Sequence, residues 1–164
     1  MRDIVVVAHN LRSTHNVGSL LRTAEGLGVS RVILSGYTPH PEREHDRRLP
    51  HEAAKTARQI RKTALGAEDM VQWDYHHEIL PVLAKLKKSG YVIAALEQTD
   101  DARDLNKYHP PDKIVLVLGR EVEGLDPEVL EVCDVALEIP MFGRKESYNV
   151  VQAAAMALYH CRFI

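Results

Sequence analysis

The chain has little cysteine, since Cys133 and Cys161 are the only two in 164 residues. Neither belongs to a Cys-x-x-Cys or Cys/His ligand pattern, so the sequence argues against a disulfide-built scaffold and gives no sign of a zinc site. The nine histidines are scattered and include no His-Glu-x-x-His pair. We therefore expect reduced, buried thiols and no metal.

Long apolar runs and an excess of positive charge are missing as well. No run approaches the roughly 20 residues of a membrane span, and residues 1–8 are too short and too soon polar for a signal peptide. We expect a cytoplasmic protein without a membrane partner. The net charge is −2, whereas a nucleic-acid-binding domain is typically basic. Any surface that binds nucleic acid must therefore be local.

The sequence does have a regular alternation of apolar runs of strand length with amphipathic stretches of helical spacing. We expect strands at residues 4–7, 31–34, 70–73, 91–96, 113–118 and 135–139. We expect helices at residues 16–28, 50–62, 79–88, 127–133 and 148–163. This order predicts an α/β fold with a mostly parallel sheet flanked by helices, and the length suits one domain spanning residues 1–164.

Ligands of such folds bind outside the carboxyl ends of the strands, which directs attention to the loops that follow them. The loop after the first strand leads into a helix through Asn16, whose side chain could cap that helix. Arg22 follows near the edge of the apolar face of the same helix. It could be a solvated arginine or a phosphate clamp, for which a guanidinium is well suited.

The loop after the strand at 113–118 contains Gly119 and Gly124, which permit a sharp turn and a close approach to a ligand. Their spacing matches neither a dinucleotide fingerprint nor a phosphate-binding loop. Glu121 could accept hydrogen bonds or orient an arginine, or it could be an exposed residue of a plain turn. Glu121 and Glu123 share one tight turn, which gives little support to paired-carboxylate hydrolysis.

The third loop follows the strand at 135–139 and joins it to an apolar helix. Pro140 and Gly143 mark turns, and Ser147 or Asn149 could simply cap the helix. The loop is long, however, and polar residues cluster before a strongly apolar helix, beyond what a cap requires. No Gly-x-Ser-x-Gly nucleophile elbow occurs in the chain.

These three segments, in this order, resemble the signature motifs of the SpoU/TrmH branch of the SPOUT RNA methyltransferases. The similar stretches are residues 16–24, 117–125 and 139–150, and the resemblance spans essentially the whole chain. It implies transfer of a methyl group from S-adenosylmethionine to a ribose 2′-hydroxyl of tRNA or rRNA. It also implies a SPOUT-type α/β knot with a C-terminal trefoil knot, and a homodimer with its cofactor sites near the interface.

The resemblance also assigns roles to residues. The family's active-site positions correspond to Asn16, Arg22, Glu121, Ser147 and Asn149. Its cofactor-binding positions, mostly backbone contacts, correspond to Leu96, Gly119, Ile139, Met141, Ser147 and Tyr148. Many relatives have leucine at the position of Tyr148, a change that leaves the backbone group in place. Because the pKa of arginine lies above about 12, we expect Arg22 to stabilise charge and hold an RNA phosphate, and the general base stays open.

Residues 42–62 carry seven Arg and Lys against four Asp and Glu, a local excess of positive charge that predicts an RNA-binding surface or a solvated face. We predict RNA contacts from Arg12, Arg43, Arg47, Arg48, Arg144 and Lys145.

Two alternative functions stay open, a SPOUT enzyme that methylates a base nitrogen and a non-catalytic RNA-binding module with the same fold. The pair Asn16 and Arg22 and the Ser147-x-Asn149 step favour the ribose. The presence of all the matching polar positions argues against a non-catalytic module.

Overall fold

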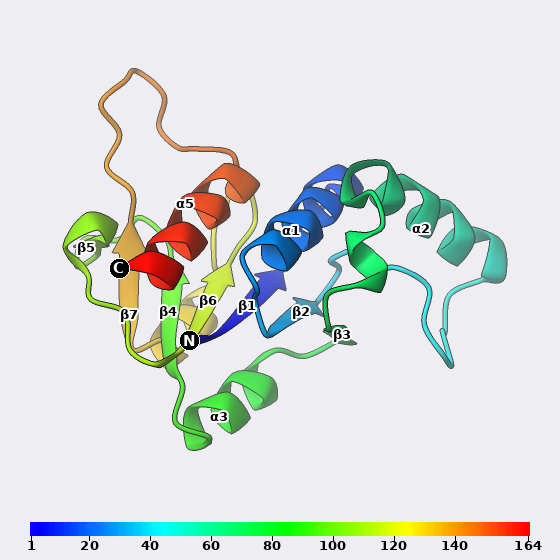
Figure 1. Ribbon diagram of the computed structural model, residues 1–164, viewed down its shortest axis with the longest axis horizontal. Coiled ribbons are helices and arrows are strands. Elements are labelled where there is room, and N and C mark those ends of the chain that lie inside the picture. Colours follow the sequence, from blue (N-terminus) through cyan, green and yellow to red (C-terminus); the bar gives the residue numbers. More distant parts are fainter.

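The computed structural model describes residues 1–164 as a seven-stranded sheet in which every pair of neighbouring strands is parallel. The strand order is β3-β2-β1-β6-β4-β7-β5, and Figure 1 shows the arrangement. The strands are β1 (Asp3–His9), β2 (Arg31–Ser35), β3 (Trp73–His76), β4 (Val92–Leu96), β5 (Arg103–Asp104), β6 (Lys113–Leu118) and β7 (Val135–Glu138). The prediction of an α/β fold with a parallel sheet is confirmed.

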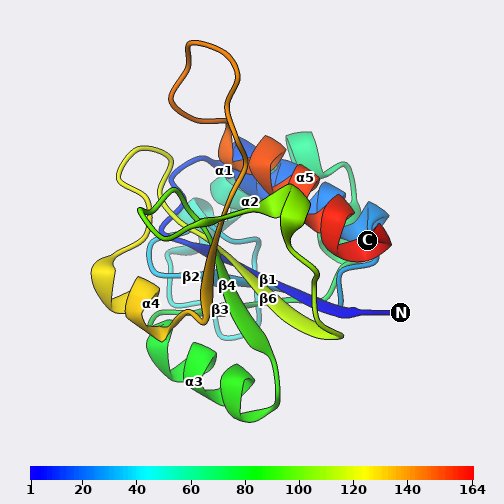
Figure 2. The same ribbon diagram turned by 90° about the vertical axis from the view of Figure 1, so that its left-hand side faces the viewer.

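Helices cover both faces of this sheet. They are α1 (Thr14–Gly26), α2 (Pro50–Ala64), α3 (Leu80–Lys88), α4 (Pro127–Val132) and α5 (Val150–Phe163), with short 3-10 turns η1 (Ala67–Asp69) and η2 (Leu105–Lys107). Figures 1 and 2 show α1, α2 and α5 on one face and α3 and α4 on the other. No helix combines the length and the apolar character needed to cross a membrane.

The two-sided cover explains why the central strands are continuous apolar runs. Along β1, Ile4 and Val6 belong to the core under α1 and α5, whereas Val5 and Val7 belong to the core under α3. All four side chains are at most 2% exposed. A strand buried on both faces has no polar side to alternate with, so β1 and β6 lie where the sequence predicts them.

Some predictions from the sequence were wrong in detail. The strand expected at residues 70–73 is β3, shifted to Trp73–His76, and Met70 is exposed. Since β3 lies at an edge of the sheet and its residues are half-buried, it lacks the apolar run that marks a central strand. The cap of α1 is Ser13, whose Oγ accepts the N–H of Asn16 at 3.1 Å, so Asn16 is not the cap.

The two cysteines are free thiols. Cys161 is buried in the core under α5, and Cys133 is half-buried at the end of α4. Burial raises the pKa of each thiol to about 11, so both stay protonated at neutral pH.

Three strands bring their carboxyl ends together where β6, β4 and β7 lie side by side. The loops that follow them are residues 119–126, 97–102 and 139–149. The last of these projects from the molecule above β7 before the chain returns as α5 (Figure 1). Helix α5 then packs against α1, β1 and β4, so the loop and the start of α5 lie over the ends of the strands.

Candidate functional site

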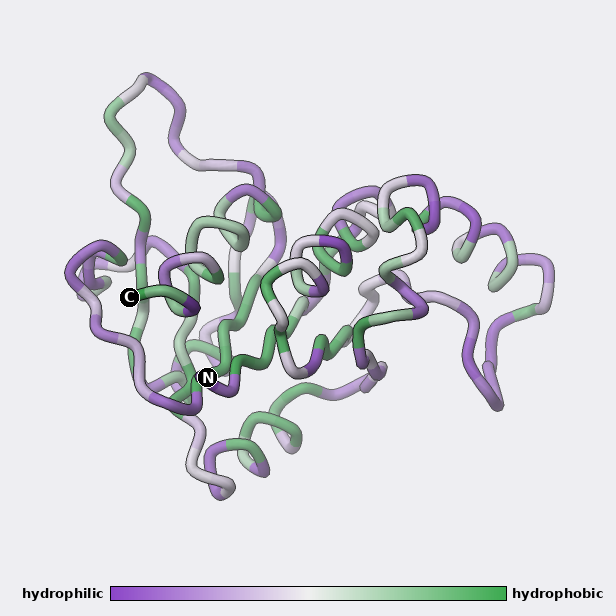
Figure 3. The backbone as a smooth tube through the Cα atoms, viewed as in Figure 1, coloured by the Kyte–Doolittle hydropathy of each residue, from purple (hydrophilic) through white to green (hydrophobic).

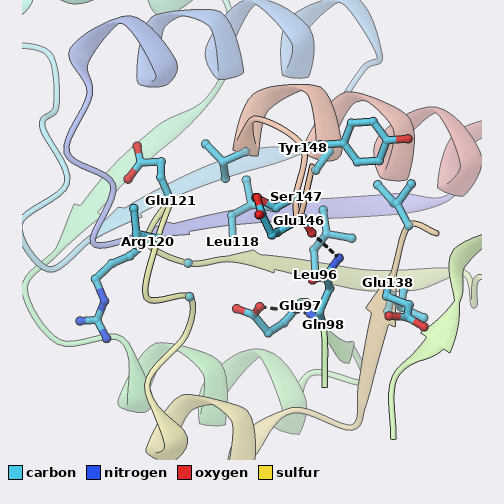
Figure 4. Close-up of a pocket in the computed structure, with 17 residues that line it drawn as sticks. Leu96, Glu97, Gln98, Leu118, Arg120, Glu121, Glu138, Glu146, Ser147 and Tyr148 are labelled. Carbon is cyan, nitrogen blue, oxygen red and sulfur yellow. Dashed lines mark hydrogen bonds between the residues drawn. The ribbon is translucent and has the colours of Figure 1, made fainter. Parts of the chain in front are cut away.

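The carboxyl ends of β4, β6 and β7 enclose a cavity of about 250 Å³ (Figure 4). Apolar side chains form part of its wall, and Glu146, Ser147 and Tyr148 from the last loop line it too. Five of the six residues predicted to bind a cofactor line this cavity, namely Leu96, Gly119, Ile139, Ser147 and Tyr148. Met141 does not line it and lies further along the projecting loop.

The loop after β6 is closed tightly on itself. Arg120 and Gly124 exchange two backbone hydrogen bonds of 3.2 Å. A Cβ on Gly119 would meet the backbone of Gly124 and Leu125 at 2.7 Å. Gly124 has φ +70°, in the left-handed region that favours glycine. Both glycines are therefore required by the shape of the loop that forms one wall of the cavity.

Glu97, the first residue after β4, ties the neighbouring loops together, and sequence reasoning overlooked it. Its carboxylate accepts the backbone N–H of Leu125 at 3.0 Å and that of Gln98 at 3.1 Å. Gln98 Nε2 donates in turn to the carbonyl of Glu146 at 3.2 Å. Like Glu121, Glu97 is an acidic residue in the loop that follows a buried strand, so the same pattern could have found it.

Three predicted active-site residues form one hydrogen-bonded chain. Asn16 Nδ2 donates to Glu121 Oε1 at 3.1 Å, and Asn149 Nδ2 donates to Asn16 Oδ1 at 3.4 Å. Asn149 Oδ1 also accepts the N–H of Val151 and caps α5. Residues from three distant segments thus meet beside the cavity, because β1 neighbours β6 in the sheet and α5 returns over α1.

The remaining two active-site candidates are placed differently. Ser147 is exposed and lines the cavity. Arg22 lies on α1, six residues beyond Asn16, and its exposed side chain forms no ion pair or hydrogen bond with other residues. The structure thus brings Arg22 to the same helix as Asn16 but does not join it to the hydrogen-bonded chain.

A buried histidine lies at the base of the loop after β6. His9 Nδ1 shares a hydrogen bond of 2.8 Å with Ser35 Oγ, and His9 Nε2 lies 3.8 Å from Asp126, which pairs with Arg120. Burial lowers the pKa of His9 below its ordinary value of 6.5, so the imidazole is neutral at pH 7. His9 thus lies next to Asp126 at the end of the loop after β6 and does not line the cavity.

The basic residues predicted to contact RNA divide into two groups. Arg48 binds both carboxylate oxygens of Asp46, and Arg43 lies 4.9 Å from the ring centre of Tyr75. Arg12 lies 3.6 Å from Glu123. By contrast, Arg47, Arg144 and Lys145 are exposed and form no ion pair. The first group is thus already occupied by contacts within the fold.

Comparison with known proteins places this site in a family. The model of the SpoU rRNA Methylase family matches residues 3–159. A tRNA (guanosine(18)-2′-O)-methyltransferase of Aquifex aeolicus is 27% identical over 98% of this chain and 69% of its own length. The 23S rRNA (guanosine-2′-O-)-methyltransferase RlmB of Neisseria meningitidis is 29% identical over 97% of this chain and 58% of its own length.

A solved structure shows the same fold. The AdoMet-bound rRNA methyltransferase of Sinorhizobium meliloti superposes with a TM-score of 0.78 at 21% identity, over 98% of this chain and 56% of the other. The chain therefore spans about 56 to 69% of the length of these three proteins. Since the family model covers nearly the whole sequence, the chain belongs to the SpoU rRNA Methylase family.

Proposed function

We propose that this protein transfers a methyl group from S-adenosylmethionine to a ribose 2′-hydroxyl of tRNA or rRNA, and that residues 1–164 form one methyltransferase domain. The observation that carries the proposal is the hydrogen-bonded chain Glu121–Asn16–Asn149, which joins the three motif segments beside the cavity. The names of the relatives agree with it, since both are ribose 2′-O-methyltransferases, one acting on tRNA and the other on rRNA.

The cavity fits the proposed cofactor in its chemistry. Leu96, Leu118 and Ile139 offer apolar surface for an adenine ring, and the loops around Gly119 and Gly124 bring bare backbone to the wall. A side chain at either glycine would fill this space or collide with its neighbours. S-adenosylmethionine, when bound, supplies a methyl group already activated by its sulfonium. We propose that Leu96, Gly119, Ile139, Met141, Ser147 and Tyr148 hold it.

The residues of this chain then have the tasks of positioning and charge stabilisation. In our proposal Arg22 holds an RNA phosphate near the target ribose, and its free guanidinium is available for this contact. Asn16 is fixed by Glu121 and Asn149, so it can orient the ribose without rearranging. Ser147 lines the cavity from the loop of residues 139–149, which follows β7. The general base is not assigned among these residues.

We further propose that the protein is a homodimer. Apolar side chains from η2, the last loop and α5 form a concave surface lined by Leu105, Ile139, Pro140, Phe142, Tyr148, Ala155, Met156, Tyr159 and Ile164, among others. Phe142 is 96% exposed and Tyr159 is 60% exposed, which is unusual for large apolar groups unless a partner covers them. Ile139 and Tyr148 also line the cavity, so a second copy here would lie beside the cofactor.

Two features of the family remain parts of the same proposal. We propose that the last loop and α5 form a trefoil knot, which the return of α5 across β4 to pack on α1 and β1 supports. We also propose that the protein acts in the cytoplasm, on the ground that its relatives modify tRNA and rRNA.

Mass spectrometry of RNA nucleosides tests the proposed reaction. RNA from a strain that lacks this protein should contain less of one 2′-O-methylated nucleoside, and the purified protein with S-adenosylmethionine should restore its amount in vitro. Restoration of a base-methylated nucleoside would show the alternative reaction on a base nitrogen. Failure to bind S-adenosylmethionine would leave the protein a non-catalytic module and refute the proposal.

A further inference from the structure

Helix α2 carries a row of basic side chains on the face that points to solvent. His51, Lys55, Arg58 and Lys62 follow one another at intervals of four, three and four residues, so they stay on one line along the helix. All four are exposed, and the buried residues Ala53, Ile60 and Ala64 lie on the opposite side. At 1.5 Å per residue, this α2 basic row extends over about 16 Å.

The cations of the row have no partner within the fold. Lys55, Arg58 and Lys62 form no ion pair and no hydrogen bond, whereas Arg61 on the same helix binds Glu68 at 2.7 Å and Asp69 at 3.2 Å. Glu52 is the only acidic residue of α2, and it pairs with none of them. The row is therefore free to bind a partner, in contrast to Arg48, which pairs with Asp46 at 2.6 Å, and to Arg12, which lies 3.6 Å from Glu123.

One end of the row lies beside the candidate active site. Thr63 Oγ1 donates to the carbonyl of His15 at 2.9 Å, next to Asn16. A Cβ on Gly18 would meet the carbonyl of Ile60 and Thr63 Oγ1 at 2.2 Å, so the two helices touch directly. Figures 1 and 3 show α2 packed beside α1 and largely hydrophilic along its length. The row thus leads outward from the turn that holds Asn16.

We propose that the α2 basic row binds the phosphodiester backbone of the RNA substrate and guides it toward Asn16 and Arg22. This inference rests on the proposed function and narrows the basic stretch at residues 42–62 to the exposed side chains of α2 that have no partner in the fold. Cations one helical turn apart can meet successive phosphates of one strand, and lysine binds phosphate as a point charge. Because the whole chain has a net charge of −2, attraction of RNA depends on local groups of free cations such as this row.

A pair of charge reversals on α2, compared with a matched pair on α3, tests this surface. Lys85 and Lys88 on α3 are exposed, form no ion pair and lie on the opposite face of the sheet. The variants K55E/R58E and K85E/K88E change the net charge by the same amount. The probes are unfractionated tRNA and rRNA, and filter binding measures the dissociation constant at several salt concentrations.

We expect K55E/R58E to weaken RNA binding about tenfold near 0.1 M salt and to reduce the slope of log affinity against log salt by about 1.4, as for two lost single-strand phosphate contacts. K85E/K88E should stay within twofold of the wild type. Both variants should bind S-adenosylmethionine with unchanged affinity, which also reports that they are folded.

Equal weakening by both pairs would overturn the inference, because the effect would then follow total charge. Unchanged RNA binding by K55E/R58E would also overturn it and would leave the α2 face to an acidic protein partner. The proposed function fails separately. If the wild type methylates RNA but K55E/R58E binds RNA as tightly as the wild type, only the inference is refuted. If RNA binding depends on α2 but no 2′-hydroxyl is methylated, α2 is an RNA-binding surface, whereas the proposed function, and with it the guiding of a substrate toward Asn16, is refuted.

Discussion

The two halves of the carboxyl edge of the sheet differ in how they are built. Around β4, β6 and β7, loops close on one another through Glu97, Gly119 and Gly124 and leave a cavity walled largely by backbone and apolar groups. Around α1 and α2, the surface is a helix face with free cations, including Arg22 and Lys62. The difference indicates that packing makes the proposed cofactor site, whereas solvent-facing charge makes the proposed RNA site.

The largest effect is expected at Arg22, because methyl transfer requires both the cofactor in the cavity and the RNA held by this residue. Arg22→Ala should lower the rate of methyl transfer by roughly 100-fold to 1,000-fold, the usual loss when one preorganised charge-stabilising group is removed. Because Arg22 does not line the cavity, the dissociation constant for S-adenosylmethionine should stay within twofold, as measured by calorimetry. Normal methylation by a variant that still binds the cofactor would remove Arg22 from the mechanism.

A smaller effect is expected at the cavity, where the affinity for the cofactor should fall. Gly119→Ala places a Cβ 2.7 Å from the backbone of Gly124 and Leu125, so the loop must move and the affinity for S-adenosylmethionine should fall about 100-fold, near the upper end of overpacking costs. Gly143→Ala is the matched control, because a Cβ there meets nothing within 4 Å. Equal affinities of the two variants would mean that the loop after β6 does not shape the cofactor site.

A substitution of Glu97 should weaken the same cofactor site by a smaller amount. Glu97→Gln removes the charge and one acceptor oxygen of the carboxylate that holds Leu125 and Gln98. We expect a loss of roughly tenfold in cofactor affinity, comparable to one charge-assisted hydrogen bond. RNA binding by the cofactor-free protein should not change. A variant with weaker RNA binding and normal cofactor binding would contradict the division between the halves.

The smallest effect concerns stability against pH. Because burial lowers the pKa of folded His9 below 6.5, the unfolded chain takes up a proton that the folded chain refuses, and stability falls as the pH drops below about 6.5. His9→Asn should lessen this loss by a few degrees in melting temperature, on the order of 2–4 °C between pH 7.5 and 5.5. Exposed His51→Asn is the control.

His40 contributes to the same dependence in the same direction, since burial lowers its pKa as well. Some loss of stability at low pH should therefore remain in His9→Asn. If the melting temperature of His9→Asn falls between pH 7.5 and 5.5 by as much as that of the wild type, His9 titrates alike in the folded and unfolded chains.

Much of the fold could be predicted because its central strands are buried on both faces. The apolar runs of β1 and β6 mark those strands directly, whereas the half-buried edge strand β3 has no such run and was placed three residues too early. The two-residue strand β5 was missed for the same reason. An edge strand forms because it pairs with an adjacent strand of the sheet, and the local sequence pattern contains no information about that pairing.

The candidate site was predictable where residue identity and position after a strand coincide. Asn16, Glu121 and Asn149 meet as the motifs suggest. The RNA surface was less predictable, because counting charges along residues 42–62 does not show which ones are paired. Arg48 has its partner two residues away in Asp46, whereas Lys55 and Arg58 have none. Only the folded chain distinguishes a structural arginine from a free one.

The central claim is that the methyl group goes to a ribose 2′-oxygen, and alkaline hydrolysis of the labelled product tests it most directly. The 2′-hydroxyl is the group that attacks the neighbouring phosphodiester in alkali, so methylation there blocks cleavage. RNA labelled by this protein with methyl-radioactive S-adenosylmethionine should therefore release its label in alkali-stable dinucleotides. Label recovered in mononucleotides would place the methyl group on a base and contradict the account.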